Sequence, residues 1–72
     1  MNHPTPIEPT NIGALIKRLR TEAGLKQTEL SGKLGVSVSA VSLWESGDRV
    51  PSLMTFFDIM SVCNKQIYYV NQ

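Results

Sequence analysis

The sequence predicts a small all-α protein, a bundle of about four helices followed by a C-terminal β-strand. Three observations support this fold class. Apolar residues between positions 11 and 63 recur at intervals of three and four, which is the spacing of amphipathic helices. Serines and glycines stand where such helices would begin and end. The last residues form a β-branched and aromatic run that is typical of a strand.

The first expected helix starts close to Asn11. Thr10 or Asn11 can cap its start, and Gly24 can end it in the left-handed conformation. Its apolar residues follow the i, i+3, i+4, i+7 spacing: Ile12, Leu15, Ile16, Leu19 and Ala23. This single apolar face predicts packing against the rest of the domain.

The second and third helices are expected close together. The second covers Gln27–Leu34, and Gly35 ends it. Ser37 caps the third, which covers Val38–Ser46. Only residues 35–37 separate the two, and so short a turn with a glycine is typical of a helix-turn-helix motif. The alternative is an ordinary helical hairpin in a small bundle.

The fourth helix and the two ends complete the predicted organisation. Ser52 caps a helix from Leu53 to about Cys63. Residues 1–10 hold three of the four prolines and are expected to form a flexible arm outside the 11–63 domain. Residues 64–72 are expected to form the strand, which would need a partner strand from outside a four-helix domain.

The composition excludes several classes of protein. One cysteine, Cys63, and one histidine, His3, exclude an internal disulfide framework and a cysteine-rich zinc site, so we expect no metal and no cofactor. No apolar run approaches the roughly 18 residues of a membrane span, so we expect a cytoplasmic protein without a membrane partner. No carboxylate pair is placed to share a proton, so we expect no enzyme. A net charge of +1 does not by itself indicate nucleic-acid binding.

The two sides of the third expected helix differ. At about 100° per residue, Ala40, Val41, Trp44 and Glu45 fall on the core side. The other side carries small or aliphatic residues: Val38, Ser39, Ser42, Leu43 and Ser46. Such groups suit close approach to the major groove of DNA, where Ser bonds base edges and Val or Leu contacts thymine methyl groups. The alternative is a solvent-facing surface with little charge.

Glu45 is the exception on the core side of that helix. An ionised carboxylate is costly to bury unless it is paired. Arg20, at the edge of the apolar face of the first helix, is the expected partner. The pair would connect the first helix to the third and set the angle of the third. The alternative is a surface ion pair that contributes almost nothing.

These residues resemble the lambda-repressor-like helix-turn-helix family of the Cro/XRE type. The resemblance covers about residues 12–63, through segments 25–30 (LKQTEL), 34–37 (LGVS), 41–47 (VSLWESG) and 51–53 (PSL). It implies sequence-specific binding of double-stranded operator DNA, usually as a dimer. It also implies that Gln27 contacts a phosphate and that the Arg20–Glu45 pair is one that this family often has.

The resemblance also assigns residues to the DNA contact. It implies that four residues at the start and on the outer side of the third helix contact bases: Ser37, Val38, Ser39 and Ser42. Leu43 lies on the same outer side and is expected to contact bases as well. The expected phosphate contacts are Gln27, Thr28, Lys17, Ser46 and Arg49. Residues 11–52 carry six basic and four acidic side chains, a balance of +2, so affinity is expected from a few well-placed contacts.

Some features depart from the family. The helical alanine of the family is replaced here by Ser31–Gly32, and the expected terminal strand replaces a fifth helix. The run 55–57 (TFF), followed by a short strand, resembles the HipB-like antitoxins more than the phage repressors. In those proteins the terminal strands of two subunits pair.

The fourth expected helix predicts a second contact surface. Its apolar residues extend almost around the helix: Leu53, Met54, Phe56, Phe57, Ile59, Met60, Val62 and Cys63. We expect the second side to be a subunit contact, although the arm or the strand is an alternative cover. The expected homodimer residues are Met60, Cys63, Ile67, Tyr68, Tyr69 and Val70. A two-fold dimer would place the two third helices about 34 Å apart, one turn of DNA.

Two functions compete. The first is a dimeric transcriptional repressor that binds a palindromic operator. The second is an antitoxin that binds and neutralises a toxin protein while repressing its own operon. For the second, the prolines of the arm and the pair Tyr68 and Tyr69 are the expected docking surfaces.

Overall fold

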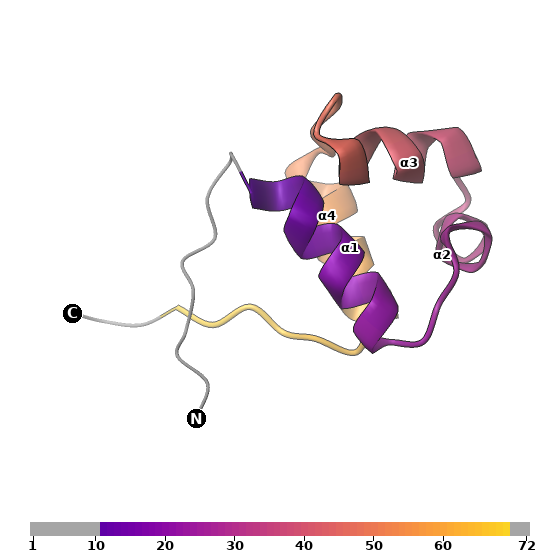
Figure 1. Cartoon of the computed structure of the whole chain (residues 1–72). Coiled ribbons are helices and arrows are strands. Elements are labelled where there is room, and N and C mark those ends of the chain that lie inside the picture. The colour runs from indigo at the N-terminus through magenta and orange to yellow at the C-terminus, as the bar shows by residue number, and fades with distance from the viewer. Residues whose placement is uncertain (1–10, 70–72) are drawn as a thin grey trace.

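The computed structural model describes residues 11–69, which form four α-helices (Figure 1). Their bounds are α1 Ile12–Glu22, α2 Gln27–Leu34, α3 Val38–Ser46 and α4 Leu53–Val62. The four predicted helices are confirmed. The predicted arm at residues 1–10 and the last three residues, 70–72, lie outside the described residues. None of the helices in 11–69 is long and apolar enough to cross a lipid bilayer.

Serine caps begin the third and fourth helices. The Oγ of Ser37 accepts a hydrogen bond from the Ala40 amide at 3.1 Å, and the Oγ of Ser52 accepts one from the Thr55 amide at 3.1 Å. Each cap satisfies an amide that has no partner within its own helix. These local bonds explain why both boundaries could be predicted from the sequence.

The core takes one fully buried side chain from each helix: Ile16, Leu30, Val41 and Ile59. Further buried residues surround these four: Leu19, Trp44, Phe56, Met60 and Cys63. Burial of this apolar surface is the main favourable term in folding. The core therefore joins all four helices in one cluster.

The predicted C-terminal strand is wrong for this structure. Residues 64–69 carry no secondary structure and leave the end of α4 as an irregular segment (Figure 1). Asn64 has a left-handed φ of 58°, and the Lys65 amide donates to the Met60 carbonyl at 2.8 Å, which ends the helix. A strand requires a neighbouring strand to bond its backbone groups, and residues 11–69 supply none.

Gly13 allows α1 to approach the end of α3 (Figure 1). A Cβ atom at this position would lie 2.5 Å from the carbonyl oxygen of Trp44 and 2.8 Å from that of Glu45. Both distances are shorter than a non-bonded carbon–oxygen contact, and both oxygens belong to the backbone. The contact between these helices therefore requires a residue without a side chain.

We expect Gly13→Ala to lower the free energy of unfolding by about 1–3 kcal/mol, because α1 must move away from α3. Urea unfolding followed by circular dichroism measures the change. Gly32→Ala is the matched control, since nothing lies within 4 Å of its Cβ position in α2. That control should stabilise the protein by about 0.4–1 kcal/mol. Equal effects of the two substitutions would contradict the close approach.

Candidate nucleic-acid interface

A tight turn connects α2 to α3. Gly35 has a left-handed φ of 72°, and the Val36 amide donates to the Ser31 carbonyl at 3.0 Å. Val36 is partly buried and packs against the core. With the Ser37 cap, these contacts hold the start of α3 at a set angle to α2. This arrangement is a helix-turn-helix.

The outer side of α3 is exposed and uncharged. Ser37, Val38, Ser39 and Ser42 are exposed, and Leu43 is partly buried. Val41 and Trp44, on the opposite side, belong to the core. The side chains expected to contact bases therefore lie together on the free side of one helix. Their contact with DNA stays a prediction.

Arg20 and Glu45 form an ion pair between α1 and α3. The Nε of Arg20 donates to Oε2 of Glu45 at 2.6 Å, and Nη2 donates to Oε1 at 3.0 Å. Nη1 donates to the Leu25 carbonyl at 2.9 Å. The Arg20 side chain is 11% exposed and that of Glu45 is 5% exposed. The guanidinium therefore joins α1, the loop before α2, and α3.

Gln27 adds a hydrogen bond to the same carboxylate. Its Nε2 donates to Oε1 of Glu45 at 3.1 Å. Burial raises the pKa of Glu45, but the hydrogen bonds from Arg20 and Gln27 outweigh it and hold that pKa below its usual range. The family resemblance implied only a phosphate contact for Gln27. Gln27 and Glu45 are 18 positions apart in the sequence, and no periodicity indicated that they would be in contact.

The other expected phosphate contacts have different surroundings. Lys17, Thr28 and Arg49 are exposed. The hydroxyl of Ser46 lies 3.0 Å from the Leu43 carbonyl oxygen and 2.9 Å from Oδ2 of Asp48. A carboxylate at this distance repels a phosphate. Ser46 is therefore the least suitable member of the set.

The residues expected at the dimer contact fall into two groups. Met60 is 7% exposed and Cys63 is 3% exposed, so the chain's own core covers both. Burial also raises the pKa of the Cys63 thiol. Ile67, Tyr68 and Tyr69 are 44%, 77% and 91% exposed, whereas Val70 lies outside the described residues. Only the group on the C-terminal segment offers surface to another chain.

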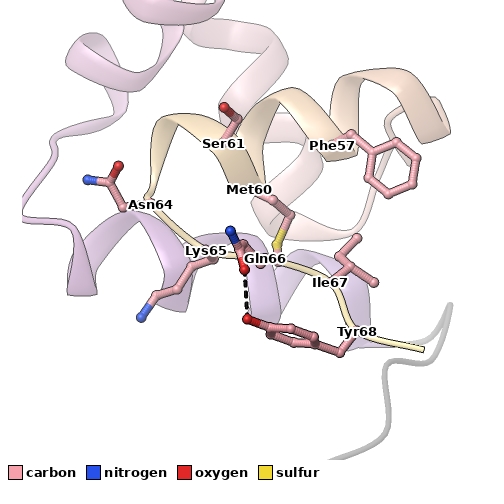
Figure 2. A pocket seen from close by; sticks show the side chains of 8 residues that line it. All are labelled: Phe57, Met60, Ser61, Asn64, Lys65, Gln66, Ile67 and Tyr68. Carbon is pink, nitrogen blue, oxygen red and sulfur yellow. Dashed lines mark hydrogen bonds between the residues drawn. The ribbon is translucent and has the colours of Figure 1, made fainter. Parts of the chain in front are cut away.

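A hollow of about 920 Å³ lies between α4 and the C-terminal segment (Figure 2). Phe57, Met60 and Ile67 supply its apolar lining. The Tyr68 hydroxyl closes one part by donating to Oε1 of Gln66 at 2.6 Å. The segment therefore covers the outer side of α4 only in part.

A second apolar surface lies at the start of α4. Val50, Leu53, Met54 and Phe57 are 63%, 68%, 70% and 44% exposed. With Ile67 they form what we call the α4 apolar patch. A groove of about 410 Å³ runs along it and is lined by apolar side chains: Ile12, Val50, Pro51, Leu53, Phe56, Phe57 and Ile67. The excess of apolar residues in the fourth helix was the only sequence signal for this patch.

Within residues 11–69, no group of three or more His, Cys, Asp or Glu side chains is placed to hold a metal ion.

Comparisons with known sequences place this chain among helix-turn-helix proteins. Residues 16–70 match the helix-turn-helix family model HTH_3. The chain is 40% identical over 58 residues to the ImmF control region 10 kDa protein of Bacillus phage phi105, covering 81% of this chain and 64% of that protein. It is 35% identical over 52 residues to Antitoxin HipB of Escherichia coli O6:H1, covering 72% and 55%. The chain thus spans less than two thirds of either relative.

Solved structures with a similar fold include two complexes of HipB. A structure of a HipA-HipB-O2-O3 complex has a TM-score of 0.75 and 25% identity, with 96% of this chain and 97% of that chain covered. A HipB-O4 20mer complex gives the same TM-score, identity and coverage. The likeness extends over nearly all of both chains.

We expect Arg20→Met to lower the free energy of unfolding by about 3 kcal/mol, because it leaves Glu45 buried without its charged partner. Thermal and urea unfolding measure this loss. Arg18→Met is the matched control: Arg18 pairs with Glu22 on the exposed side of the same helix, and such pairs contribute about 0.5 kcal/mol or less. A double variant, Arg20→Met with Glu45→Met, should recover most of the loss. A single variant as stable as the wild type would show that the pair contributes nothing.

Proposed function

Because the chain belongs to the helix-turn-helix family, we propose that this DNA-binding regulator is a sequence-specific repressor that binds a palindromic operator as a homodimer. The observation that carries the proposal is the exposed, uncharged outer side of α3, held in place by the Arg20–Glu45 pair. The similarity to a phage control-region protein supports a regulatory role.

In the proposed complex, α3 enters the major groove, which is about 12 Å wide and admits a helix. The hydroxyls of Ser37, Ser39 and Ser42 bond base edges, and Val38 and Leu43 contact thymine methyl groups. Their small size lets the backbone of α3 come close to the bases. These contacts supply the sequence preference.

Phosphate contacts set the position of α3 on the duplex. Amides at the start of α2 attract a phosphate because the first amides of a helix have no partner in it. Gln27, Thr28, Lys17 and Arg49 add side-chain contacts. Contacts of this kind fix orientation but carry no sequence information. A single domain with so little net charge therefore binds DNA weakly. A dimer binds DNA more tightly because both domains make their contacts at once.

We propose that the dimer contact includes the α4 apolar patch and the C-terminal Tyr68 and Tyr69. A two-fold contact brings each residue close to its own copy or to a neighbour of it, so like charges would face each other. The groove along the patch is lined without a charged side chain, which suits such a contact. Met60 and Cys63 then stabilise α4 from inside the monomer.

A second candidate function is that of an antitoxin. It is favoured by the 35% identity to Antitoxin HipB and by the exposure of Tyr68 and Tyr69. In this role the C-terminal segment binds a toxin while α3 binds the operator. Co-expression with the protein encoded next to this gene tests the idea, because a toxin complex should survive purification in high salt, whereas DNA contacts weaken steeply with salt.

We expect Ser39→Ala with Ser42→Ala to weaken operator binding by about 1–3 kcal/mol while the thermal unfolding midpoint stays unchanged, because both side chains are exposed and their expected partners are bases. The operator is first obtained by selecting bound sequences from a random DNA pool, and affinity is then measured by fluorescence anisotropy. Ser61→Ala, on the exposed side of α4, is the control. Wild-type affinity in the double variant would show that another surface contacts the bases.

We expect the wild type to have a solution mass near twice 8.0 kDa, and Leu53→Glu with Met54→Glu to return it to the monomer. Acidic residues are favourable in the first turn of a helix, so α4 should remain folded. Light scattering measures the mass. Ala14→Glu, which places a charge in the exposed first turn of α1, is the control and should remain dimeric. A dimeric double variant would exclude the α4 apolar patch as the contact.

A further inference from the structure

Side chains from two helices, Arg20 and Gln27, bind the carboxylate of Glu45 on a third helix. Oε1 of Glu45 accepts from Nη2 of Arg20 at 3.0 Å and from Nε2 of Gln27 at 3.1 Å, while Oε2 accepts from Nε of Arg20 at 2.6 Å. Arg20 belongs to α1, Gln27 is the first residue of α2, and Glu45 lies near the end of α3. The carboxylate is therefore bound from two directions.

We propose that Gln27 is a specificity-determining positioning residue, which holds Glu45 and thereby fixes the rotation of α3 about its own axis. This inference rests on the proposed DNA-binding function and goes beyond it. The family resemblance implies a phosphate contact for Gln27. The structure gives its side chain a partner on the recognition helix itself.

A second bond to Glu45 matters because even a small rotation of α3 displaces the ends of its side chains. Side chains reach about 5–6 Å from the axis of a helix, so a rotation of 10° moves their ends by about 1 Å. Hydrogen bonds between heavy atoms span only about 2.5–3.2 Å. Ser39 and Ser42 lie on the side of α3 that faces away from the core, and a shift of this size breaks their bonds to base edges. Contacts made by α2 to phosphates do not shift.

Apolar packing defines the rotation of α3 less sharply than hydrogen bonds do. Val41 and Trp44 hold α3 against the core, but apolar contacts are not directional. Arg20 holds the carboxylate from α1, and Gln27 adds a bond from α2. A carboxamide also has two N–H groups, and Glu45 engages one of them. The same side chain thus holds Glu45 while its second N–H can bond a phosphate, which would connect the DNA backbone directly to α3.

The test separates positioning from phosphate contact. Gln27→Met keeps the length of the side chain and removes its donors. Affinities for the selected operator and for a scrambled duplex of the same length and composition are measured at one salt concentration. We expect the ratio of the two affinities to fall about tenfold, similar to the effect of a mismatched base pair, while the affinity for the scrambled duplex falls only by the loss of one phosphate contact.

Thr28→Val is the matched control, because Thr28 is the exposed next residue of α2 and is expected to contact a phosphate alone. It should weaken both affinities equally and leave their ratio unchanged. Gln27→Lys is the rescue variant. Its ammonium can donate to Glu45, so it should restore the ratio while it strengthens binding to both duplexes.

A readout without DNA completes the test. Titration of the Glu45 carboxyl by NMR should show a higher pKa in Gln27→Met than in the wild type, because a hydrogen bond to the charged form is lost. The inference is overturned if the variant keeps the wild-type ratio, or if both affinities fall equally. A wild type that selects no DNA sequence would instead refute the proposed function, while the titration would still show whether Gln27 holds Glu45.

Discussion

The arrangement of this domain depends on a charged group that is almost entirely removed from solvent. Glu45 is ionised and only 5% exposed, so its burial is unfavourable unless its oxygens are satisfied. The planar guanidinium of Arg20 satisfies both oxygens and still donates to the Leu25 carbonyl. A single cation thus holds α1, the loop before α2, and α3 together. These bonds link α3 to two segments that precede it in the chain.

Directional bonds matter here because the core is small. One side chain from each helix is fully buried, and apolar contacts of this kind are not directional. The ion pair and the Gln27 amide add directional bonds near the end of α3. Gly13 contributes in a different way, by letting the backbone of α1 reach the carbonyl groups at the same end of α3. The polar contacts of Glu45 and the close approach at Gly13 therefore lie at the same end of α3.

The domain also leaves apolar side chains in contact with water at the start of α4. Val50, Leu53 and Met54 are each more than 60% exposed, and residues 64–69 cover α4 only in part. Large apolar patches on small proteins usually mark interaction surfaces. The exposed side of α3 and the α4 apolar patch are thus the two surfaces for which we propose partners, DNA for the first and a second copy of the chain for the second.

The four helices, their serine caps and the division of α3 into a core side and an outer side could all be predicted from the sequence. These features depend on residues within one or two turns of each other, so periodicity and capping rules are sufficient. Other features became visible only in the folded structure. Gln27 bonds Glu45, and Gly13 contacts the end of α3. In α4, Met60 and Cys63 face inward, whereas Leu53 and Met54 face outward. The structure also showed that residues 64–69 form no strand. Each of these depends on which segments become neighbours in space, and local sequence patterns do not encode that.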